Sequence, residues 1–311
     1  MISKTPPDWT EPHLKVKVKS PSWFITAISH PIASHYVEVD GCLIHYLTWQ
    51  QKNSPIKKTK PGLLLIHGGG AHANWWRFIA PSFLDEYQVA AIDLSGMGDS
   101  GARDEYTAEH RSKEISAVLK DANLGTAPII IGHSFGGLMT MRFAAHHGEQ
   151  VGGVIIVDSP VLPESEKSSA APRRALSVSR HYPTFEIGLE RFRLLPKQEC
   201  QNQFIVEFIA RHSLRETVSG WTWKFDVAAM GSHRWAEPFE EHLHNMKCRS
   251  ALIVADNSAI VSSVTAQYMS DLMGPESPMT TIEDSHHHIM LDQPFRFIDA
   301  VKKILHDWDL K

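Results

Sequence analysis

A serine in this sequence stands in a setting that suits a nucleophile. Gly132-His133-Ser134-Phe135-Gly136 follows the apolar run 129–131 and precedes residues 138–146, which have helical spacing. The G-x-S-x-G pattern requires this strand-turn-helix context, and glycines on both sides let neighbouring backbone approach the serine closely. We therefore predict that Ser134 is a nucleophile held in a sharp turn.

A serine hydroxyl is a weak nucleophile until a base removes its proton. His286-His287-His288 follows the strand-like residues 279–283 and precedes the last helical pattern, so it can supply that base. A histidine-rich surface loop and a metal site are the alternatives. Because the three histidines are successive and no spaced partner such as H-E-x-x-H accompanies them, we expect no metal site.

A glycine-rich loop offers the donors that a developing oxyanion needs. His67-Gly68-Gly69-Gly70 follows the apolar run 63–66. Glycine suits such a loop because a ligand oxygen must come close to bare backbone. We expect His67 to order the loop by hydrogen bonding rather than to transfer protons.

Together these segments resemble the α/β-hydrolase family. The catalytic histidine of that family precedes a short acidic-x-Pro stretch, and Asp292-Gln293-Pro294 in that place puts His287 at the catalytic position. The resemblance also implies an oxyanion hole built from the backbone N–H groups of Gly69 and Phe135, with Gly70 as a further donor.

The acid of the triad departs from the usual pattern of the family. Its common position, two residues before the apolar pair 260–261, holds Ser258, which is not an acid. Two carboxylates remain, Asp256 in the same loop and Asp158 at the end of the preceding strand-like run. Some members of the family supply their acid from that preceding strand, so we favour Asp158 and keep Asp256 as the alternative. Both keep the chain order Ser, Asp, His.

The resemblance extends from about residue 35 to the end and is weakest across residues 160–244. Residues 93–100 look like the D-x-x-G-x-G-x-S turn of the family, which we expect to be structural. We take Trp75, Trp76 and His133 as candidates for the substrate pocket, although the two tryptophans fit the hydrophobic core equally well.

The elements that must position these residues alternate along the chain. A hairpin pattern over 35–49 is followed by short apolar runs typical of strands buried on both faces, with helical patterns between several of them. This order predicts an α/β fold with a mostly parallel central sheet and helices on both faces. Residues 35–159 and 245–311 form the predicted core. Residues 160–244 show helical spacing and no strand-like run, so we predict a helical cap.

Residues 1–34 form a predicted N-terminal extension. Three lysines at positions 15, 17 and 19 precede the short apolar stretch 22–28. We expect this arm to pack on its own domain or on a second subunit, which makes a homodimer through the arm a prediction. Contact with a membrane surface is the alternative.

The overall composition limits the classes of ligand and the cellular setting that we expect. The net charge of −4 gives no reason to expect nucleic acid as a ligand. The three cysteines are odd in number and lack metal-ligand spacing, so we expect free thiols and a cytoplasmic protein. The first residues lack the pattern of a signal peptide and no apolar run reaches membrane-spanning length, so we expect no membrane insertion.

The predicted function is that of a serine hydrolase acting on an ester of an uncharged, partly apolar small molecule, without cofactor or metal. A dinucleotide-binding interpretation, based on Gly68-x-Gly70-x-x-Ala73 and Asp93, leaves Ser134 and His287 unexplained. A binding protein of the same fold, a carbon–carbon bond hydrolase and a cofactor-free haloperoxidase stay open, because fold does not determine function. Enzymes with an aspartate nucleophile, such as epoxide hydrolases, are disfavoured by Ser134.

Overall fold

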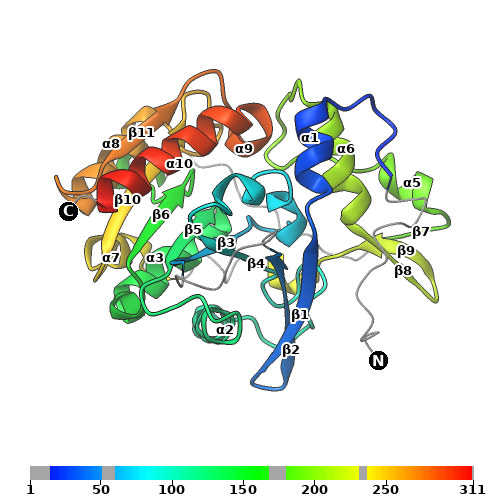
Figure 1. Cartoon of the computed structure of the whole chain (residues 1–311), viewed down its shortest axis with the longest axis horizontal. Helices are drawn as coiled ribbons and strands as arrows, with labels where there is room; N and C mark the ends of the chain where they lie inside the picture. The colour runs from blue at the N-terminus through cyan, green and yellow to red at the C-terminus, as the bar shows by residue number, and fades with distance from the viewer. Residues whose placement is uncertain (1–14, 51–59, 168–179, 231–236, 310–311) are drawn as a thin grey trace.

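The computed structural model describes residues 15–50, 60–167, 180–230 and 237–309. Its central sheet has eight strands in the order β1-β2-β4-β3-β5-β6-β10-β11 (Figure 1). The strands are β1 (Ile32–Val39), β2 (Cys42–Trp49), β3 (Gly62–Ile66), β4 (Gln88–Ile92), β5 (Ile129–His133), β6 (Gly153–Val157), β10 (Arg249–Ala255) and β11 (Met279–Ile282). The predicted α/β fold is confirmed.

The sheet changes from antiparallel to parallel at β4. Strands β1 and β2 form the predicted hairpin through Asp40 and Gly41, both of which have positive φ, 46° and 76°, as tight hairpin turns require. Strand β2 pairs antiparallel with β4, and the pairs from β4 through β3, β5, β6 and β10 to β11 are parallel. The carboxyl ends of these parallel strands therefore meet at one edge.

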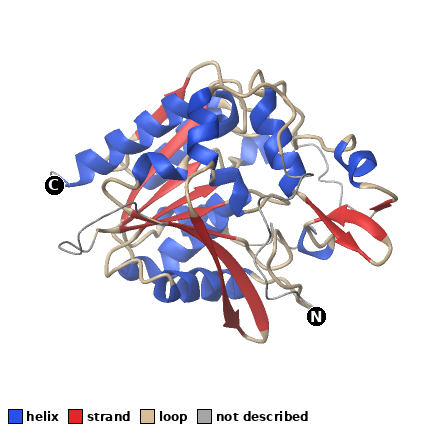
Figure 2. Cartoon of the chain, turned by 45° about the vertical axis from the view of Figure 1, so that its right-hand side comes forward, coloured by secondary structure: helices blue, strands red, loops and turns tan. Residues whose placement is uncertain are grey.

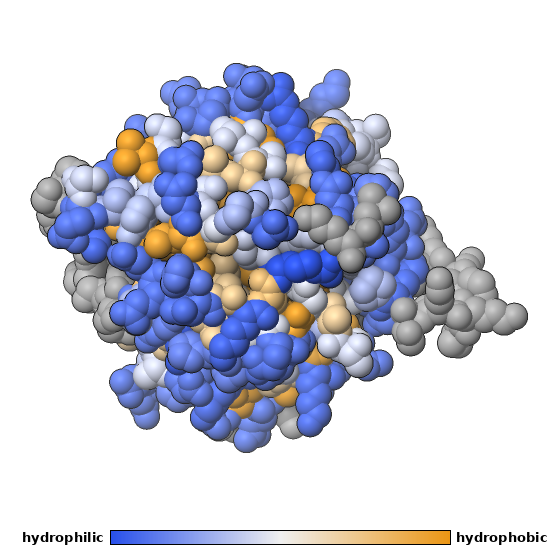
Figure 3. All heavy atoms as spheres, turned by 90° about the vertical axis from the view of Figure 1, so that its left-hand side faces the viewer, coloured by the Kyte–Doolittle hydropathy of each residue, from blue (hydrophilic) through white to orange (hydrophobic). Residues whose placement is uncertain are grey.

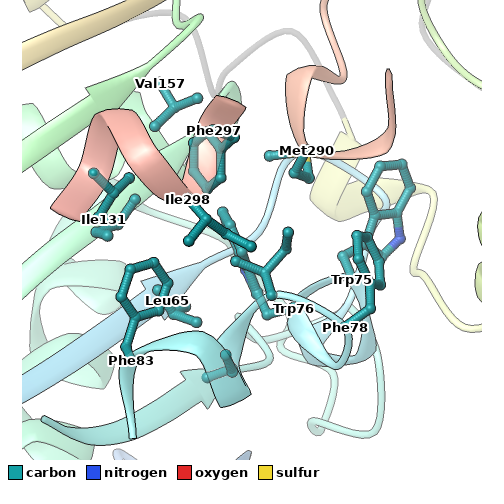
Figure 4. Close-up of a cluster of buried hydrophobic side chains, with 14 of the residues drawn as sticks. Leu65, Trp75, Trp76, Phe78, Phe83, Ile131, Val157, Met290, Phe297 and Ile298 are labelled. Atoms are coloured by element: carbon teal, nitrogen blue, oxygen red, sulfur yellow. The ribbon is translucent and has the colours of Figure 1, made fainter. Parts of the chain in front are cut away.

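Helices cover both faces of the sheet. Alternate residues of β3 point to opposite sides, with Leu63 and Leu65 in one hydrophobic cluster and Leu64 and Ile66 in the other. The first cluster contains side chains of α10 and the short helices η2 and η3, as Figure 4 shows. The second contains side chains of α2, α3, α7 and α8. The helices are α1 (Ser22–Ile28), α2 (Ala108–Asp121), α3 (Phe135–His147), α4 (Glu164–Lys167), α5 (Phe185–Leu189), α6 (Gln203–His212), α7 (Phe239–His244), α8 (Ser263–Met273), α9 (Ile289–Asp292) and α10 (Pro294–Asp309), with η2 (Ala73–Trp76), η3 (Ala80–Phe83), η4 (Gly148–Gln150) and η5 (Ala228–Met230).

The segment between β6 and β10 is not purely helical, which corrects the sequence prediction. It contains a separate antiparallel sheet in the order β7-β9-β8, visible away from the central sheet in Figure 2. Its strands are β7 (His181–Tyr182), β8 (Leu214–Thr217) and β9 (Gly220–Trp223), too short to give a clear alternation in the sequence. Helix α7, which the predicted boundary assigns to the cap, contacts α3 and α8 of the core. Residues 168–179 and 231–236 of the predicted cap lie outside the described residues.

The described part of the N-terminal extension packs on its own chain. Phe24 of α1 is fully buried, and its ring meets those of Phe78, Phe204 and Phe208 at 4.9–5.9 Å between centroids. Trp23 lies against Phe204 of α6. Residues 1–14 of the extension lie outside the described residues, and the homodimer stays a prediction.

The length of the helices and the polarity of the surface also bear on the sequence predictions. Among the described residues, no helix combines the length and the apolar character needed to cross a bilayer. On the face drawn in Figure 3, hydrophobic residues form small patches between hydrophilic ones, a distribution that globular proteins commonly show.

Candidate active site

Four loops at the carboxyl end of the sheet bring the predicted residues to one place. The glycine loop 67–70 follows β3, Ser134 follows β5, Asp158 follows β6, and His287 lies in the loop after β11. Open parallel sheets bind their ligands at this edge, because the loops from neighbouring strands converge there.

Ser134 occupies a strained turn between β5 and α3. Its backbone has φ 52° and ψ −120°, a region that residues with side chains rarely adopt and that costs about 1–3 kcal/mol. The turn is held by a hydrogen bond from the Ser134 N–H to the Val157 carbonyl, 2.9 Å long. A Cβ added at Gly136 would lie 2.4 Å from the His67 carbonyl oxygen, so glycine is required there. The side chain of Ser134 is partly exposed.

Ser134, His287 and Asp158 form a continuous hydrogen-bonded chain. Nε2 of His287 lies 3.0 Å from Ser134 Oγ, and Nδ1 of His287 lies 2.7 Å from Asp158 Oδ2. Because a carboxylate only accepts, the Nδ1–H donates to Asp158, and the free lone pair on Nε2 accepts the serine hydroxyl. His287 is 2% and Asp158 0% exposed. The arrangement can therefore take a proton from Ser134 and stabilise the resulting imidazolium.

Two further hydrogen bonds orient Asp158. The Ala255 N–H donates to Oδ1 at 3.0 Å, and the Ser258 hydroxyl donates to Oδ2 at 2.6 Å. Ser258 stands where the resembling family usually has its acid, and here its hydroxyl supports the carboxylate of Asp158. In the sequence Ser258 marks only the absence of an acid at this position, and no local pattern signals its supporting role.

The alternative acid, Asp256, serves the backbone of a neighbouring turn. Its carboxylate accepts the N–H groups of Asp284 and Ser285, each at 3.0 Å. Although burial opposes the effect, these hydrogen bonds hold the pKa of Asp256 below its usual value. Its side chain is exposed, whereas Asp158 is fully buried against His287.

The acidic-x-Pro stretch fixes the loop that carries His287. Asp292 Oδ2 accepts the backbone N–H of His286 at 2.8 Å and lies 3.2 Å from Nδ1 of its ring. Gln198 of the insertion accepts the backbone N–H of His288 at 2.9 Å and donates to Asp292 at 3.0 Å. The insertion therefore helps to hold the histidine loop in place.

The glycine loop is ordered by His67, as the sequence predicts. The Leu94 N–H donates to Nε2 of His67 at 3.1 Å, so Nδ1 carries the proton and donates to the Gly68 carbonyl at 2.7 Å. Burial lowers the pKa of His67, which favours its neutral form. Gly69 and Gly70 are partly exposed, and Gly70 has φ +70° within a turn closed by the Ala71 N–H and the Gly68 carbonyl.

Phe135, the second oxyanion candidate, is the first residue of α3. Its N–H therefore lies at the positive end of the helix dipole, next to the serine. Two residues of the insertion, Phe225 and Met230, approach the glycine loop from the other side. A Cβ added at Gly70 would lie 3.4 Å from Met230 Cε and 3.7 Å from Phe225 Cδ1. No sequence motif links these two side chains to the site.

The three predicted pocket residues lie inside the molecule. Trp76 is 1% exposed and packs on Phe297 in the cluster of Figure 4. Its burial in this cluster agrees with the core interpretation, and its pocket role stays a prediction. Trp75 is 7% exposed and its ring lies 5.0 Å from that of His288, so its pocket role stays a prediction.

His133 is 1% exposed and lies next to the loop that carries His287. Its Nε2 donates to the backbone carbonyl of His287 at 3.0 Å. Burial, followed by the charge of His287, lowers the pKa of His133 well below its usual value. His133 thus supports the loop from within the fold, and its predicted contact with substrate stays a prediction.

Asp93, on which the alternative dinucleotide interpretation depends, has a carboxylate that accepts hydrogen bonds from the protein itself. It is fully buried and accepts Nδ1–H of His45 at 2.7 Å, the Ala73 N–H at 2.5 Å and the Asp99 N–H at 2.8 Å. His45, Asp93 and Asp99 lie close enough to share an ion, but Lys224 already pairs with Asp99 at 2.7 Å. The expected structural role of this turn agrees with these contacts.

Comparison with known proteins identifies the family of this chain. Residues 63–300 match the family model described as the alpha/beta hydrolase family. An esterase of Mycobacterium tuberculosis is 25% identical over 256 residues, which cover 79% of this chain and 83% of the esterase. Epoxide hydrolase 1 of Caenorhabditis elegans is 22% identical over 298 residues, 88% of this chain and 70% of that enzyme. The crystal structure of E-2-(acetamidomethylene)succinate hydrolase has a TM-score of 0.72 at 16% identity, over 89% of this chain and all of that one, and so agrees in fold.

Proposed function

This chain belongs to the alpha/beta hydrolase family, and from that premise we propose that it is a serine hydrolase. Its substrate is a carboxylic ester, or a related acyl compound, of an uncharged and partly apolar small molecule. The observation that carries the proposal is the hydrogen-bonded chain from Ser134 through His287 to Asp158, with distances of 3.0 and 2.7 Å.

The proposed reaction begins when Ser134 attacks the substrate carbonyl. Nε2 of His287 takes the hydroxyl proton as the new carbon–oxygen bond forms, and the buried carboxylate of Asp158 stabilises the imidazolium. The N–H groups of Gly69 and Phe135 stabilise the oxyanion, with Gly70 as a further donor. His287 then gives the proton to the leaving alcohol. A water molecule, activated by His287, releases the acid from Ser134 by the same steps in reverse.

The identity of the nucleophile separates this proposal from epoxide hydrolysis. Epoxide hydrolases are among the relatives of this chain, and enzymes of that kind attack with a carboxylate. Here the nucleophile position holds Ser134, whose hydroxyl requires the base that His287 supplies. An acyl substrate, whose carbonyl carbon accepts an alkoxide, therefore fits the site better than an epoxide.

The insertion supports an uncharged, partly apolar substrate. Phe225 and Met230 lie against Gly70, and both side chains are partly exposed. A substrate bound at the proposed oxyanion hole would therefore contact an aromatic ring and a thioether. Such groups favour apolar substituents, because they offer contact area without a partner for a charge.

The proposal is tested by the hydrolysis of a series of nitrophenyl esters by wild type and three variants. Ser134→Ala and His287→Ala should each lower kcat by at least about a thousandfold while the thermal midpoint stays close to that of wild type. His286→Ala is the matched control, since its exposed ring has no place in the proposed chemistry, and it should keep most of the activity.

Full turnover by Ser134→Ala would contradict the proposal. Tight binding of a ligand by a folded wild-type protein that hydrolyses no ester would instead support the binding-protein alternative. Cleavage of a vinylogous diketone, with no turnover of esters, would support the carbon–carbon bond hydrolase.

A further inference from the structure

Three imidazole rings meet beside the proposed nucleophile. His133 comes from the end of β5, and His287 and His288 come from the loop after β11. The ring centroids lie 4.7 Å apart for His133 and His287, 5.4 Å for His133 and His288, and 4.7 Å for the two successive histidines. One nitrogen from each ring lies within 4.8 Å of the other two. Zinc bound by three histidines has Zn–N distances of about 2.0–2.1 Å, so a modest closure of the rings would complete such a site.

Two of the rings already have the outer partners that metal-binding histidines need. Such histidines almost always donate their second N–H to a carboxylate, a backbone carbonyl or water. His287 Nδ1 donates to the Asp158 carboxylate at 2.7 Å, and His133 Nε2 donates to the His287 carbonyl at 3.0 Å. The unprotonated nitrogens are then Nδ1 of His133 and Nε2 of His287. Their lone pairs are the ones that can bind an ion.

On the third ring, His288, neither nitrogen has a described partner at full hydrogen-bonding distance and angle, although the Leu195 carbonyl lies near the ring. His288 is 4% exposed, and burying a polar group without a partner is costly. The nearby Leu195 carbonyl, which favours a proton on this ring, can serve as its outer partner. With one nitrogen of His288 facing Leu195, the other is left for an ion, and the ring lies next to that of His287.

We propose that His133, His287 and His288 form an inhibitory site for a divalent transition-metal ion such as Zn²⁺. Three imidazole nitrogens suit Zn²⁺, Cu²⁺ or Co²⁺, whereas Mg²⁺ and Ca²⁺ prefer oxygen ligands. Ser134, whose Oγ lies 3.0 Å from His287 Nε2, is partly exposed, so we expect an ion to enter past it. The charge of the ion is partly balanced by the Asp158 carboxylate on the far side of His287.

Inhibition follows because the ion and Ser134 compete for the same lone pair. Nε2 of His287, 3.0 Å from Ser134 Oγ, cannot bind a metal and accept the serine proton at the same time. Coordination through Nδ1 instead would break the bond to Asp158. In both cases the hydroxyl loses its activated base. The inhibitory effect rests on the function proposed above, whereas the binding of the ion does not.

The first test measures ester hydrolysis against Zn²⁺ concentration in wild type, His288→Gln and the matched control His286→Gln. Wild type should lose activity reversibly, with recovery on adding EDTA. The concentration for half-inhibition should rise by at least about tenfold in His288→Gln, since losing even an outer partner of a metal ligand costs 10- to 100-fold in affinity. His286→Gln should match wild type. Equal sensitivity of His288→Gln and wild type would overturn the proposal.

The second test does not depend on turnover. Co²⁺ is titrated into Ser134→Ala, which keeps all three histidines, and into Ser134→Ala/His288→Phe, which keeps a ring against Trp75 but removes its nitrogens. The first variant should bind one ion with the intense visible absorption of four-coordinate Co²⁺, and the second should lose it. A weak, six-coordinate spectrum in Ser134→Ala would overturn the site even if ester hydrolysis had never been found. Circular dichroism establishes that both variants are folded.

Discussion

Replacing Asp158 by asparagine should remove most of the activity while leaving the fold intact. In the structure the carboxylate accepts three hydrogen bonds, from His287 Nδ1, Ser258 Oγ and the Ala255 N–H. Asparagine has nearly the same shape but only one accepting oxygen. If its amide NH₂ faces His287, the ring must carry its proton on Nε2 and can no longer accept the proton of Ser134.

The size of the effect can be estimated in two ways. Two opposite charges about 4 Å apart at an effective dielectric constant of 20 attract by about 4 kcal/mol. Since 1.36 kcal/mol is tenfold in rate, losing the charge opposite the imidazolium lowers kcat by roughly a thousandfold. The wrong tautomer adds to this loss, and the equivalent change in a serine protease costs about 10⁴ in kcat. We therefore expect a loss of about 10³ to 10⁴ with little change in KM.

The assay is steady-state hydrolysis of a nitrophenyl ester, with Asp256→Asn as the matched control. Asp256 is exposed and binds the backbone of Asp284 and Ser285, so its replacement should change kcat by less than about tenfold. A larger loss in Asp256→Asn than in Asp158→Asn would refute the assignment of the acid.

A second substitution, at Ser258, separates loss of the carboxylate from disturbance of the fold. Ser258 Oγ lies 2.6 Å from the oxygen of Asp158 that faces His287, so a carboxylate at position 258 can reach the same ring. Adding Ser258→Asp to Asp158→Asn should recover about tenfold or more in kcat, which corresponds to ~1.4 kcal/mol. If asparagine acted by disturbing the fold, the additional aspartate would not restore the rate.

Three further predictions concern the loop, the N-terminal arm and pH. Gly68→Ala should lower kcat by about 100-fold, because the new Cβ would lie 3.1 Å from His133 Nδ1 and 3.3 Å from Ser134 Cβ; an unchanged kcat would contradict the tight fit. Phe24→Ala should cost about 3–5 kcal/mol of unfolding free energy, whereas Ile25→Ala, at a side chain 46% exposed, should cost less than about 0.5 kcal/mol by urea denaturation. Burial lowers the pKa values of His133 and His288, so the unfolded chain binds more protons below its ordinary histidine pKa of about 6.5. Stability should therefore be fully present above that pH and fall below it, by roughly 1.4 kcal/mol per pH unit for each residue; urea midpoints that stay level between pH 7 and pH 5.5 would argue against it.

Local patterns explain why much of the fold and the sharp turn at Ser134 could be predicted. The hairpin through Asp40 and Gly41 and the buried strands β3 to β6 follow from residue alternation and apolar runs that need no distant partner. The turn at Ser134 is set by its neighbours as well, because glycine is required where the chain approaches the His67 carbonyl.

Features that depend on distant contacts were less accessible from the sequence. Strands β7, β8 and β9 are two to four residues long and gain their partners only when the insertion folds, so helical spacing was the stronger signal. Trp76 fits a pocket and the core equally well in the sequence, and only the folded chain shows its contact with Phe297.

The histidine cluster was missed for the same reason. In the sequence, only residues 286–288 are grouped, and three successive residues cannot easily turn their rings toward one point. In the structure the third ring beside His287 and His288 is that of His133, not of His286. The His133 ring donates a hydrogen bond to the carbonyl of His287, 154 positions away. The motif around Ser134 contained this histidine, but no local signal linked it to the loop after β11.

The central claim is that His287 and Asp158 activate Ser134, and covalent labelling tests it most directly. The folded protein is incubated with a fluorophosphonate, its intact mass is measured, and the labelled peptide is mapped. The proposal predicts one adduct, located on Ser134, with labelling slowed strongly in His287→Ala and in Asp158→Asn. A folded wild-type protein that takes up no label, or an adduct on another serine that persists in Ser134→Ala, would contradict it.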